Sequence, residues 1–280
     1  MKPLFQQDHR VVLFDLSNVV FRACAVGGED YLRLFCTMMA NYRKTFGFRK
    51  FVHAIEGKGT DERRKLFPAY KEGRVPTEEI LDSRKTCLAL LRCTDCTIIK
   101  APRGEADDAI GVYVKENPKK VITIVSEDKD LWQLVRPSTC SVHSKRRGTV
   151  TPETVRSIMK VPPSKIVLHK AVFGDASDGL PRVPQVPSKV LLQLVQNSSS
   201  VKELLAEASE LRMRSRAEAI LRCKRQIRTN YKLARIRTKL PMRSKTYEAD
   251  EKKLRLRLRK NGVDGVLNRE IKLFLGQEGL

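Results

Sequence analysis

The stretch Val11-Val-Leu-Phe-Asp15 sets a carboxylate directly after four consecutive apolar residues, and this pattern decides how the rest of the chain is interpreted. Short apolar runs rich in β-branched residues are typical of strands that are buried on both faces. Three more such runs follow: Phe51-Val-His-Ala-Ile55, Thr97-Ile-Ile99 and Val121-Ile-Thr-Ile-Val125. Between them, amphipathic stretches predict helices over residues 30–42, 76–91 and 105–115. The alternation predicts an α/β fold, a parallel sheet with helices on both faces.

Acidic residues follow each of the predicted strands. Asp15 ends the first strand, and Glu56 follows the second. Gly104-Glu-Ala-Asp-Asp108 comes after the third, and Ser126-Glu-Asp-Lys-Asp130 comes after the fourth. Because the carboxyl ends of such strands meet at one crevice, we expect these carboxylates to lie together. Their repulsion would be on the kcal/mol scale, and Mg²⁺ or Mn²⁺ would neutralise it.

Each acidic cluster also has a simpler explanation when it is taken alone. The acids of residues 105–108 could complement the dipole of a helix N-terminus. Asp128 and Asp130 could be a helix cap and a first-turn acid, and Asp175 and Asp178 could be ordinary turn residues. The joint placement of the clusters at one sheet edge favours the metal site.

The charge balance indicates a polyanionic partner. Among 280 residues, 55 are Lys or Arg and 32 are Asp or Glu, which gives a net charge of +23. Residues 212–260 alone hold nineteen Lys and Arg against four Asp and Glu. This segment could be a solvated helical face, but such clustering favours binding to the phosphates of nucleic acid.

The chain lacks the sequence features of membrane or secreted proteins. No apolar run approaches the ~18 residues of a membrane span, and the N-terminus lacks the apolar core of a signal peptide. Seven cysteines, an odd number scattered among apolar residues, indicate reduced thiols and hence an intracellular protein. The lone pair Cys93 and Cys96 is expected to be two half-buried thiols, with a zinc or redox site as the alternative.

Five ordered segments resemble the motifs of the 5′-nuclease (flap endonuclease) family, which includes the 5′→3′ exonuclease domain of bacterial DNA polymerase I and stand-alone phage 5′→3′ exonucleases. They are residues 13–22, 63–74, 104–108, 126–134 and 174–181, and the similarity continues through residues 233–241. The resemblance implies a PIN-like sheet within an α/β nuclease core, residues 1–160, with a helical arch at about 60–92. It also implies a helical DNA-binding region, residues 161–280, with a helix-hairpin-helix-like segment at about 170–197.

The family's metal ligands fall on acidic positions of this chain. The resemblance implies two Mg²⁺ or Mn²⁺ ions, held by two groups of carboxylates. The first group is Asp15, Glu105, Asp107 and Asp108, and the second is Asp128, Asp130, Asp175 and Asp178. Glu56 lies at a position where the family usually has Asp. Its extra methylene group places the carboxylate further from the main chain, which changes how it would coordinate a metal ion.

Basic residues take further roles by the same resemblance. Lys71 and Arg74 lie in the segment that resembles the family's gateway helix, where they would hold the scissile phosphate, and Arg22 is a further basic candidate at the first helix. Arg63, Arg64 and Tyr70 are expected to contact DNA in the arch, although a solvated helix face, or packing of the aromatic rings inside the arch, is the alternative.

The family's Gly-rich hairpin turn is altered here. The positions at which the family has glycines hold Arg182, Gln185 and Pro187 in this chain. A proline has no backbone N–H to donate. The substitution counts against a K⁺ site and against the usual backbone contact with duplex DNA. Arg182 and Lys189 are expected to contact the duplex with their side chains instead.

The resemblance implies a structure-selective 5′→3′ exonuclease and flap endonuclease that hydrolyses DNA by two-metal-ion catalysis. Its expected partners are DNA with 5′ ends, flaps or gaps and replication proteins, and the chain is expected to be a monomer. Three alternatives stay open. They are a nuclease that removes RNA primers from RNA–DNA hybrids, a catalytically inactive DNA-binding scaffold, and a PIN-type ribonuclease, which would not need the long helical half.

Overall fold

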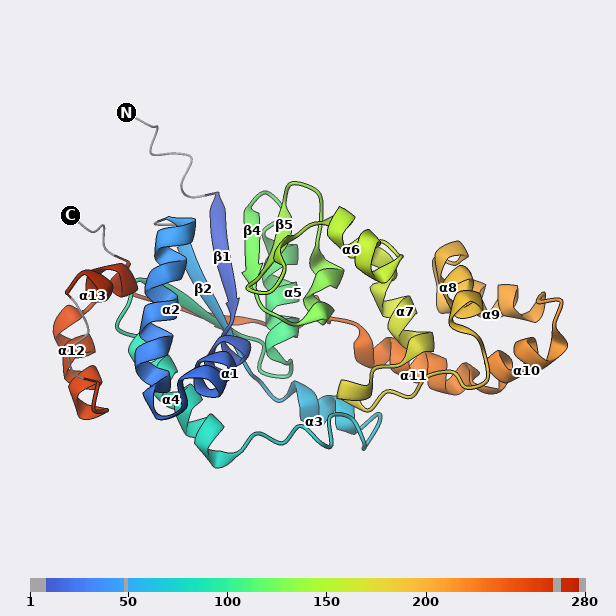
Figure 1. The fold of residues 1–280 in the computed structure, drawn as a ribbon, viewed down its shortest axis with the longest axis horizontal. Coiled ribbons are helices and arrows are strands. Elements are labelled where there is room, and N and C mark those ends of the chain that lie inside the picture. Colours follow the sequence, from blue (N-terminus) through green and yellow to red (C-terminus); the bar gives the residue numbers. More distant parts are fainter. Residues whose placement is uncertain (1–8, 48–49, 264–267, 277–280) are drawn as a thin grey trace.

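The computed structural model describes residues 9–47, 50–263 and 268–276, and a seven-stranded sheet lies at its centre (Figure 1). The strand order is β6-β5-β4-β1-β2-β3-β7. Strands β1 to β5 pair in parallel, and β6 and β7 pair antiparallel at the two edges. The bounds are β1 Arg10–Asp15, β2 Lys50–Ile55, β3 Cys96–Lys100, β4 Val121–Val125, β5 Cys140–Ser144, β6 Gly148–Val150 and β7 Arg243–Tyr247. The four predicted strands are confirmed, and β5, β6 and β7 were not foreseen.

Each face of the sheet packs against its own set of helices. Val12 and Phe14 of β1 point into one core, whereas Val11 and Leu13 point into the other, as the two-residue period of a strand requires. The first core includes side chains of α1 (Leu16–Gly27), α2 (Tyr31–Phe46), α4 (Glu78–Leu91), α12 (Glu251–Lys260) and α13 (Asn268–Leu275). The second includes α5 (Ala106–Glu116), α6 (Pro152–Met159) and Trp132.

A helical region extends from one end of the sheet (Figure 1). It has a core of its own, formed by α7 (Ile166–Phe173), α8 (Ser188–Asn197), α9 (Val201–Ser209), α10 (Arg214–Arg222) and α11 (Lys224–Ala234). After α11 the chain returns to the sheet as β7, and then α12 and α13 complete the first core. Residues 161–280 are therefore not helical throughout. Strand β7 escapes prediction because four of its five residues are exposed at an edge, so its sequence carries no apolar pattern.

The expected arch, about residues 60–92, is helical at its two ends. Helix α3 (Gly59–Arg64) begins it, α4 ends it, and residues 65–77 between them form turns and irregular chain. Gly59 lies so close to the chain before α5 that an added Cβ would stand 2.2 Å from Glu105 N. A glycine is therefore needed where α3 crosses the start of α5.

The cysteines agree with the expectation of reduced core thiols. All seven are unpaired, and five of them are buried. The Cys93 and Cys96 thiols each donate a hydrogen bond to a main-chain carbonyl, which favours two packed thiols over a zinc or redox site. No helix among the described residues is both long enough and apolar enough to cross a membrane.

Candidate active site

Four of the predicted carboxylates gather at the carboxyl ends of the strands. Asp15 is the last residue of β1, and Glu56 directly follows β2. Asp107 lies in the first turn of α5, and Asp128 caps the 3-10 turn that follows β4. Glu56 and Asp128 act electrostatically on Asp15, and Asp128 and Asp15 act on Asp107. The sheet thus brings together acids that lie far apart in the sequence.

Burial and mutual repulsion disfavour the charged forms of two of these acids, Asp15 and Asp107. Burial, followed by the charges of Glu56 and Asp128, raises the pKa of Asp15 to about 7, although the Asn18 backbone N–H donates to its carboxylate at 3.1 Å. Burial and the charges of Asp128 and Asp15 raise the pKa of Asp107 well above its usual range. Oxygen donors that repel one another in this way fit a hard divalent cation, which would remove the repulsion.

A second group of acids lies where the helical region meets the sheet. Asp130, Asp175 and Asp178 each offer a carboxylate oxygen, and these atoms lie within 4.8 Å of one another. The Lys170 ammonium, from α7, pairs with Asp130 and lies 2.6 Å from Asp175 Oδ2. Burial raises and Lys170 lowers the pKa of Asp175, and the net shift is downward. The three acids are predicted ligands, whereas Lys170 was not foreseen.

Asp108 was expected to bind a metal ion, and in the structure both of its carboxylate oxygens pair with arginines. Its side chain is fully buried, and its two oxygens accept hydrogen bonds from Arg63 Nη1 and Nη2 at 3.1 and 2.9 Å. Arg237 donates to the same carboxylate from its backbone N–H at 2.8 Å and from its guanidinium. Two arginines therefore occupy both oxygens, and Asp108 is an internal ion-pair partner.

Glu105 is likewise surrounded by side-chain donors. Its Oε2 lies 2.7 Å from Arg63 Nη1 and 3.0 Å from Lys71 Nζ, and it accepts a hydrogen bond from the Tyr70 hydroxyl at 3.3 Å. Its Oε1 accepts a hydrogen bond from the Thr60 hydroxyl at 2.7 Å. In this arrangement Glu105 holds the segment that carries Lys71, so its contacts also differ from those of a free metal ligand.

Arg63 and Tyr70 were expected to contact DNA, and in the structure both side chains are buried. Arg63 is 7% exposed, and its Nε donates to the Leu233 carbonyl at 3.2 Å. Tyr70 is 2% exposed and packs with Leu180, Leu233 and Ala234. Both residues belong to the internal frame of the site.

Lys71 lies between the two acidic groups, and Arg74 pairs with the second of them. The Lys71 backbone has φ 52°, a left-handed conformation, and its N–H donates to the Asp178 carbonyl at 3.1 Å. Burial lowers and Glu105 raises the pKa of Lys71, and the net shift is upward, so the ammonium stays charged. Arg74 is about half exposed, and its Nη1 lies 2.9 Å from Asp178 Oδ1.

The other predicted basic residues lie around this centre. Arg22 is half-buried, with Nη1 3.9 Å from Glu127 Oε1, and its guanidinium donates to the Tyr42 hydroxyl at 3.2 Å. Arg64 donates to the backbone carbonyls of Tyr70 and Lys71, both at 3.0 Å, and so braces the turn before Lys71.

The altered hairpin turn keeps a left-handed residue without a glycine. Gln185 has φ 58°, where a residue with a side chain is strained. Arg182 Nη2 donates to the Val186 carbonyl at 2.9 Å and to the Ser188 hydroxyl at 3.2 Å, so one of its amino groups braces the turn. Lys189 is exposed.

Several supporting residues could not be predicted from the sequence because they act through other side chains. Thr60 carries no motif of its own. Arg237 lies in the segment 233–241 that resembles the family, but nothing in that segment indicates its pairing with Asp108. The Ser126 hydroxyl, which donates to Asp15 at 3.0 Å, lies inside a motif that was interpreted through its acids. Lys170 had a signal, since it is the only Lys or Arg in the apolar helix Ile166–Phe173.

Comparisons with known proteins cover nearly the whole chain. Residues 10–160 match the family model described as 5′-3′ exonuclease, N-terminal resolvase-like domain, and residues 161–259 match the 5′-3′ exonuclease, C-terminal SAM fold. The chain belongs to the 5′-3′ exonuclease family. The family and the fold class expected from the sequence are thereby confirmed.

Relatives of this family member include polymerases and a separate exonuclease. The chain is 27% identical over 254 residues to the thermostable DNA polymerase I of Thermus thermophilus, a match that covers 86% of this chain and 30% of the polymerase. It is 27% identical over 210 residues to a 5′-3′ exonuclease of Buchnera aphidicola, covering 72% and 73% of the two chains. The chain thus spans under a third of the length of the polymerase.

Solved structures share the fold at lower sequence identity. The T5 D15 protein, co-crystallised with metal ions, has a TM-score of 0.71 and 17% identity over 82% of this chain and 90% of its own. Human GEN1, in complex with Holliday junction DNA, has a TM-score of 0.66 and 16% identity over 98% of this chain and 73% of its own.

Proposed function

We propose that this member of the 5′-3′ exonuclease family is a metal-dependent 5′ nuclease that hydrolyses phosphodiester bonds of DNA with 5′ ends, flaps or gaps. The observation that carries the proposal is the meeting of Asp15, Asp107 and Asp128 at one sheet edge beside Lys71, with the pKa of Asp15 raised to about 7. Such an arrangement is costly for a folded protein unless a cation and a phosphate complete it.

Some of the carboxylates would bind cations, and others hold the basic side chains of the site in place. Asp15, Glu56, Asp107 and Asp128 would hold one divalent cation. Asp130, Asp175 and Asp178 would hold the second, which would displace the Lys170 ammonium from Asp130 and Asp175. Mg²⁺ or Mn²⁺ bound there would lower the pKa of water and neutralise the oxygens of the phosphate. Asp108 and Glu105 instead fix the positions of Arg63 and Lys71 through the contacts described above.

Lys71 and Arg74 would hold the scissile phosphate. Lys71 is charged, and its Nζ is held by Glu105. Asp107 and Asp178 also interact with it electrostatically. A fixed ammonium aimed at developing negative charge stabilises the transition state without reorganisation. Arg74, about half exposed and paired with Asp178, can turn a planar guanidinium toward two phosphate oxygens.

The helical region would bind the duplex part of the substrate. Helix α11 carries four exposed basic residues, which are Lys224, Arg225, Arg228 and Lys232. Lys189 and the free part of Arg182 lie beside the altered turn. We propose residues 10–160 as the nuclease core, and residues 161–240 as the region that positions DNA relative to it.

The test is cleavage of a 5′-labelled flap substrate. Wild-type protein with Mg²⁺ is expected to release a short 5′ product, and EDTA is expected to abolish the reaction. Asp107→Asn removes one carboxylate from the first group and is expected to abolish cleavage while it leaves binding in place. Binding without any cleavage by the wild-type protein in Mg²⁺ would instead support a DNA-binding scaffold.

A further inference from the structure

Helix α12 presents a basic face on the opposite side of the sheet from the helical region. Figure 1 shows α12 and α13 at one end of the molecule and α8 to α10 at the other. Of the ten residues of α12 (Glu251–Lys260), five are exposed, and four of these are basic: Lys252, Lys253, Arg259 and Lys260. The fifth is Leu256, which is 54% exposed.

The spacing of these residues puts them on one side of the helix. At about 100° per residue, the five exposed positions fall within an arc of about 120°, and Lys252 to Lys260 spans about 12 Å. Leu254 and Leu258 point the other way and are buried in the first core. The helix is therefore fixed with its basic face outward.

These four cations have no acidic partner among the described residues. The one acid on the helix, Glu251, pairs with Arg255 at 2.7 Å. No ion pair involves Lys252, Lys253, Arg259 or Lys260 in the part of the chain that the structure describes. Four unpaired cations held on about 12 Å of rigid helix repel one another, and a polyanion would relieve this repulsion.

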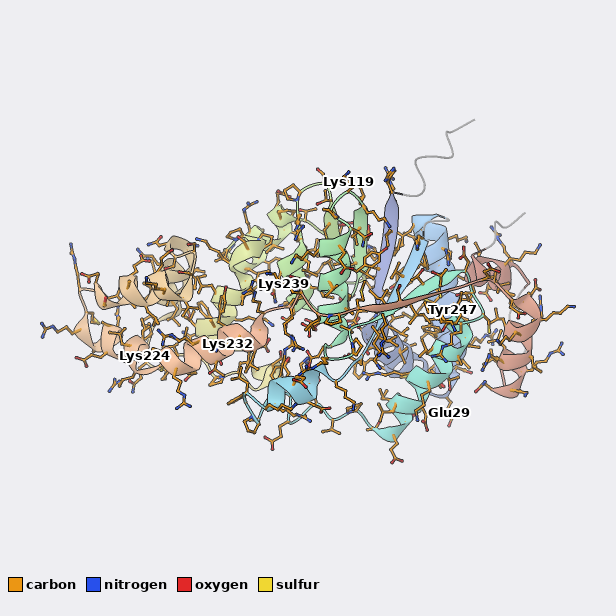
Figure 2. All side chains as sticks on the ribbon, turned by 180° about the vertical axis from the view of Figure 1, so that it is seen from behind. Glu29, Lys119, Lys224, Lys232, Lys239 and Tyr247 are labelled. Atoms are coloured by element: carbon orange, nitrogen blue, oxygen red, sulfur yellow. The ribbon has the colours of Figure 1, made fainter. Side chains whose placement is uncertain are left out.

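Other exposed basic residues lie along β7, between the helical region and α12. Figure 2 shows Lys224 and Lys232 on α11, then Lys239, then Tyr247 at the end of β7, running across the back of the molecule. Arg243 and Lys245, on β7, are exposed along the same path. Exposed positive charge thus runs from α11 along the edge of the sheet as far as Glu248 and Asp250, which are exposed and separate it from the basic face of α12.

We propose that the outer face of α12 binds the phosphate backbone of a duplex arm of the substrate, separate from the part of the substrate that α11 contacts. The proposal rests on the proposed function, since a branched or gapped DNA supplies two duplex arms. Nucleic acid is the partner that these observations favour because its negative charge repeats about every 1.7 Å along the duplex axis and so matches a row of lysines and arginines.

The test compares two variants that each remove four positive charges. The first is Lys252→Gln, Lys253→Gln, Arg259→Gln and Lys260→Gln. The matched control is Lys44→Gln, Lys115→Gln, Lys119→Gln and Arg136→Gln, all exposed residues near the amino ends of the strands, opposite the acids. Figure 2 shows Lys119 at that edge.

Binding is measured by fluorescence anisotropy in EDTA, over a range of salt concentrations, on flap DNAs with two long duplex arms or with one arm shortened. The α12 variant is expected to bind the two-armed DNA about tenfold more weakly. Its slope of log affinity against log salt is expected to fall by up to about 0.9 for each phosphate that the protein no longer neutralises. The control variant is expected to keep the wild-type slope, and the α12 variant is expected to match the wild type on the shortened DNA.

Equal slopes for the wild type and the α12 variant would overturn the proposal, and so would an equally weakened affinity in the control variant. Cleavage with Mg²⁺ is assayed in parallel on the same DNAs. If wild-type protein binds through α12 but never cleaves, the proposed nuclease function fails while the surface stands. If it cleaves and the α12 slope is unchanged, only the surface fails.

Discussion

The Lys71 ammonium lies 3.0 Å from Glu105 Oε2, so the charged group that lies between the two acidic clusters is held by a carboxylate at the start of α5. The same oxygen lies 2.7 Å from Arg63 Nη1, and Arg63 in turn binds Asp108. A chain of ion pairs thus runs from the buried frame to the group proposed to hold the phosphate. The residues that come directly after Lys71, 72–74, are exposed. The buried ion pairs with Glu105 and Arg63 therefore fix the position of Lys71.

Glu105→Gln is expected to lower the single-turnover cleavage rate by about 10- to 100-fold, because one charge-assisted contact contributes about 1.5–3 kcal/mol. DNA affinity, measured separately by anisotropy, is expected to change little. In protein that already carries Lys71→Ala, Glu105→Gln is expected to lower the cleavage rate almost no further, because Glu105 acts through Lys71. Full additivity of the two effects would show that Glu105 acts independently of Lys71, for instance as a metal ligand.

Asp108→Asn is expected to cost about 3–5 kcal/mol of unfolding free energy, because it leaves the half-buried Arg237 without a counter-charge and the buried Arg63 with Glu105 alone. Urea unfolding monitored by circular dichroism measures this change. Asp61→Asn, at an exposed position in nearby α3, serves as the control and is expected to change stability by less than about 0.5 kcal/mol. A wild-type unfolding midpoint for Asp108→Asn would contradict the assigned role.

Asp15→Asn is expected to stabilise the metal-free protein increasingly as pH rises. The folded-state pKa of Asp15, about 7, lies above its ordinary value of 3.8. Wild-type protein therefore loses stability as pH rises through this window, whereas asparagine has no proton to lose. The difference in unfolding free energy between variant and wild type should grow from near zero at about pH 4 toward a limit of about 4 kcal/mol above about pH 7. A difference that stays constant with pH would refute the raised pKa.

Divalent cations are expected to raise the melting temperature of the wild-type protein. A ligand at about 100 times its dissociation constant stabilises the folded state by about 2.7 kcal/mol. Mg²⁺ and Mn²⁺ should each shift the thermal unfolding curve upward near neutral pH, and EDTA should reverse the shift. Asp107→Asn should reduce the shift, while Asp61→Asn should retain it. An equal shift in the two variants would place the bound cations elsewhere.

The central strands and the carboxylates at their ends were predictable from sequence because buried parallel strands are apolar throughout and their ends are fixed by topology. Strand β7 was not predictable, because the sequence of an exposed edge strand carries no continuous apolar run. The structure divides the expected ligand set into acids that face one another and acids that pair with arginines. Nothing in Gly104-Glu-Ala-Asp-Asp108 shows that Asp107 faces the other acids while Asp108 turns inward to Arg237, because that partner comes from a segment 129 residues further along the chain.

The return of the chain to the sheet after α11 has a consequence for how the two regions depend on each other. Leu254, Leu258, Ile271 and Phe274 fill the same apolar interior as Phe14 and Phe35, although they are encoded last. A fragment ending near residue 160 would lack these four side chains and so would expose Phe14 and Phe35 to water. It would also lack β7, which would leave β3 as an unpaired edge strand. The nuclease core can thus finish folding only after residues 161–240 have been synthesised, because the helices that complete it come after them in the chain.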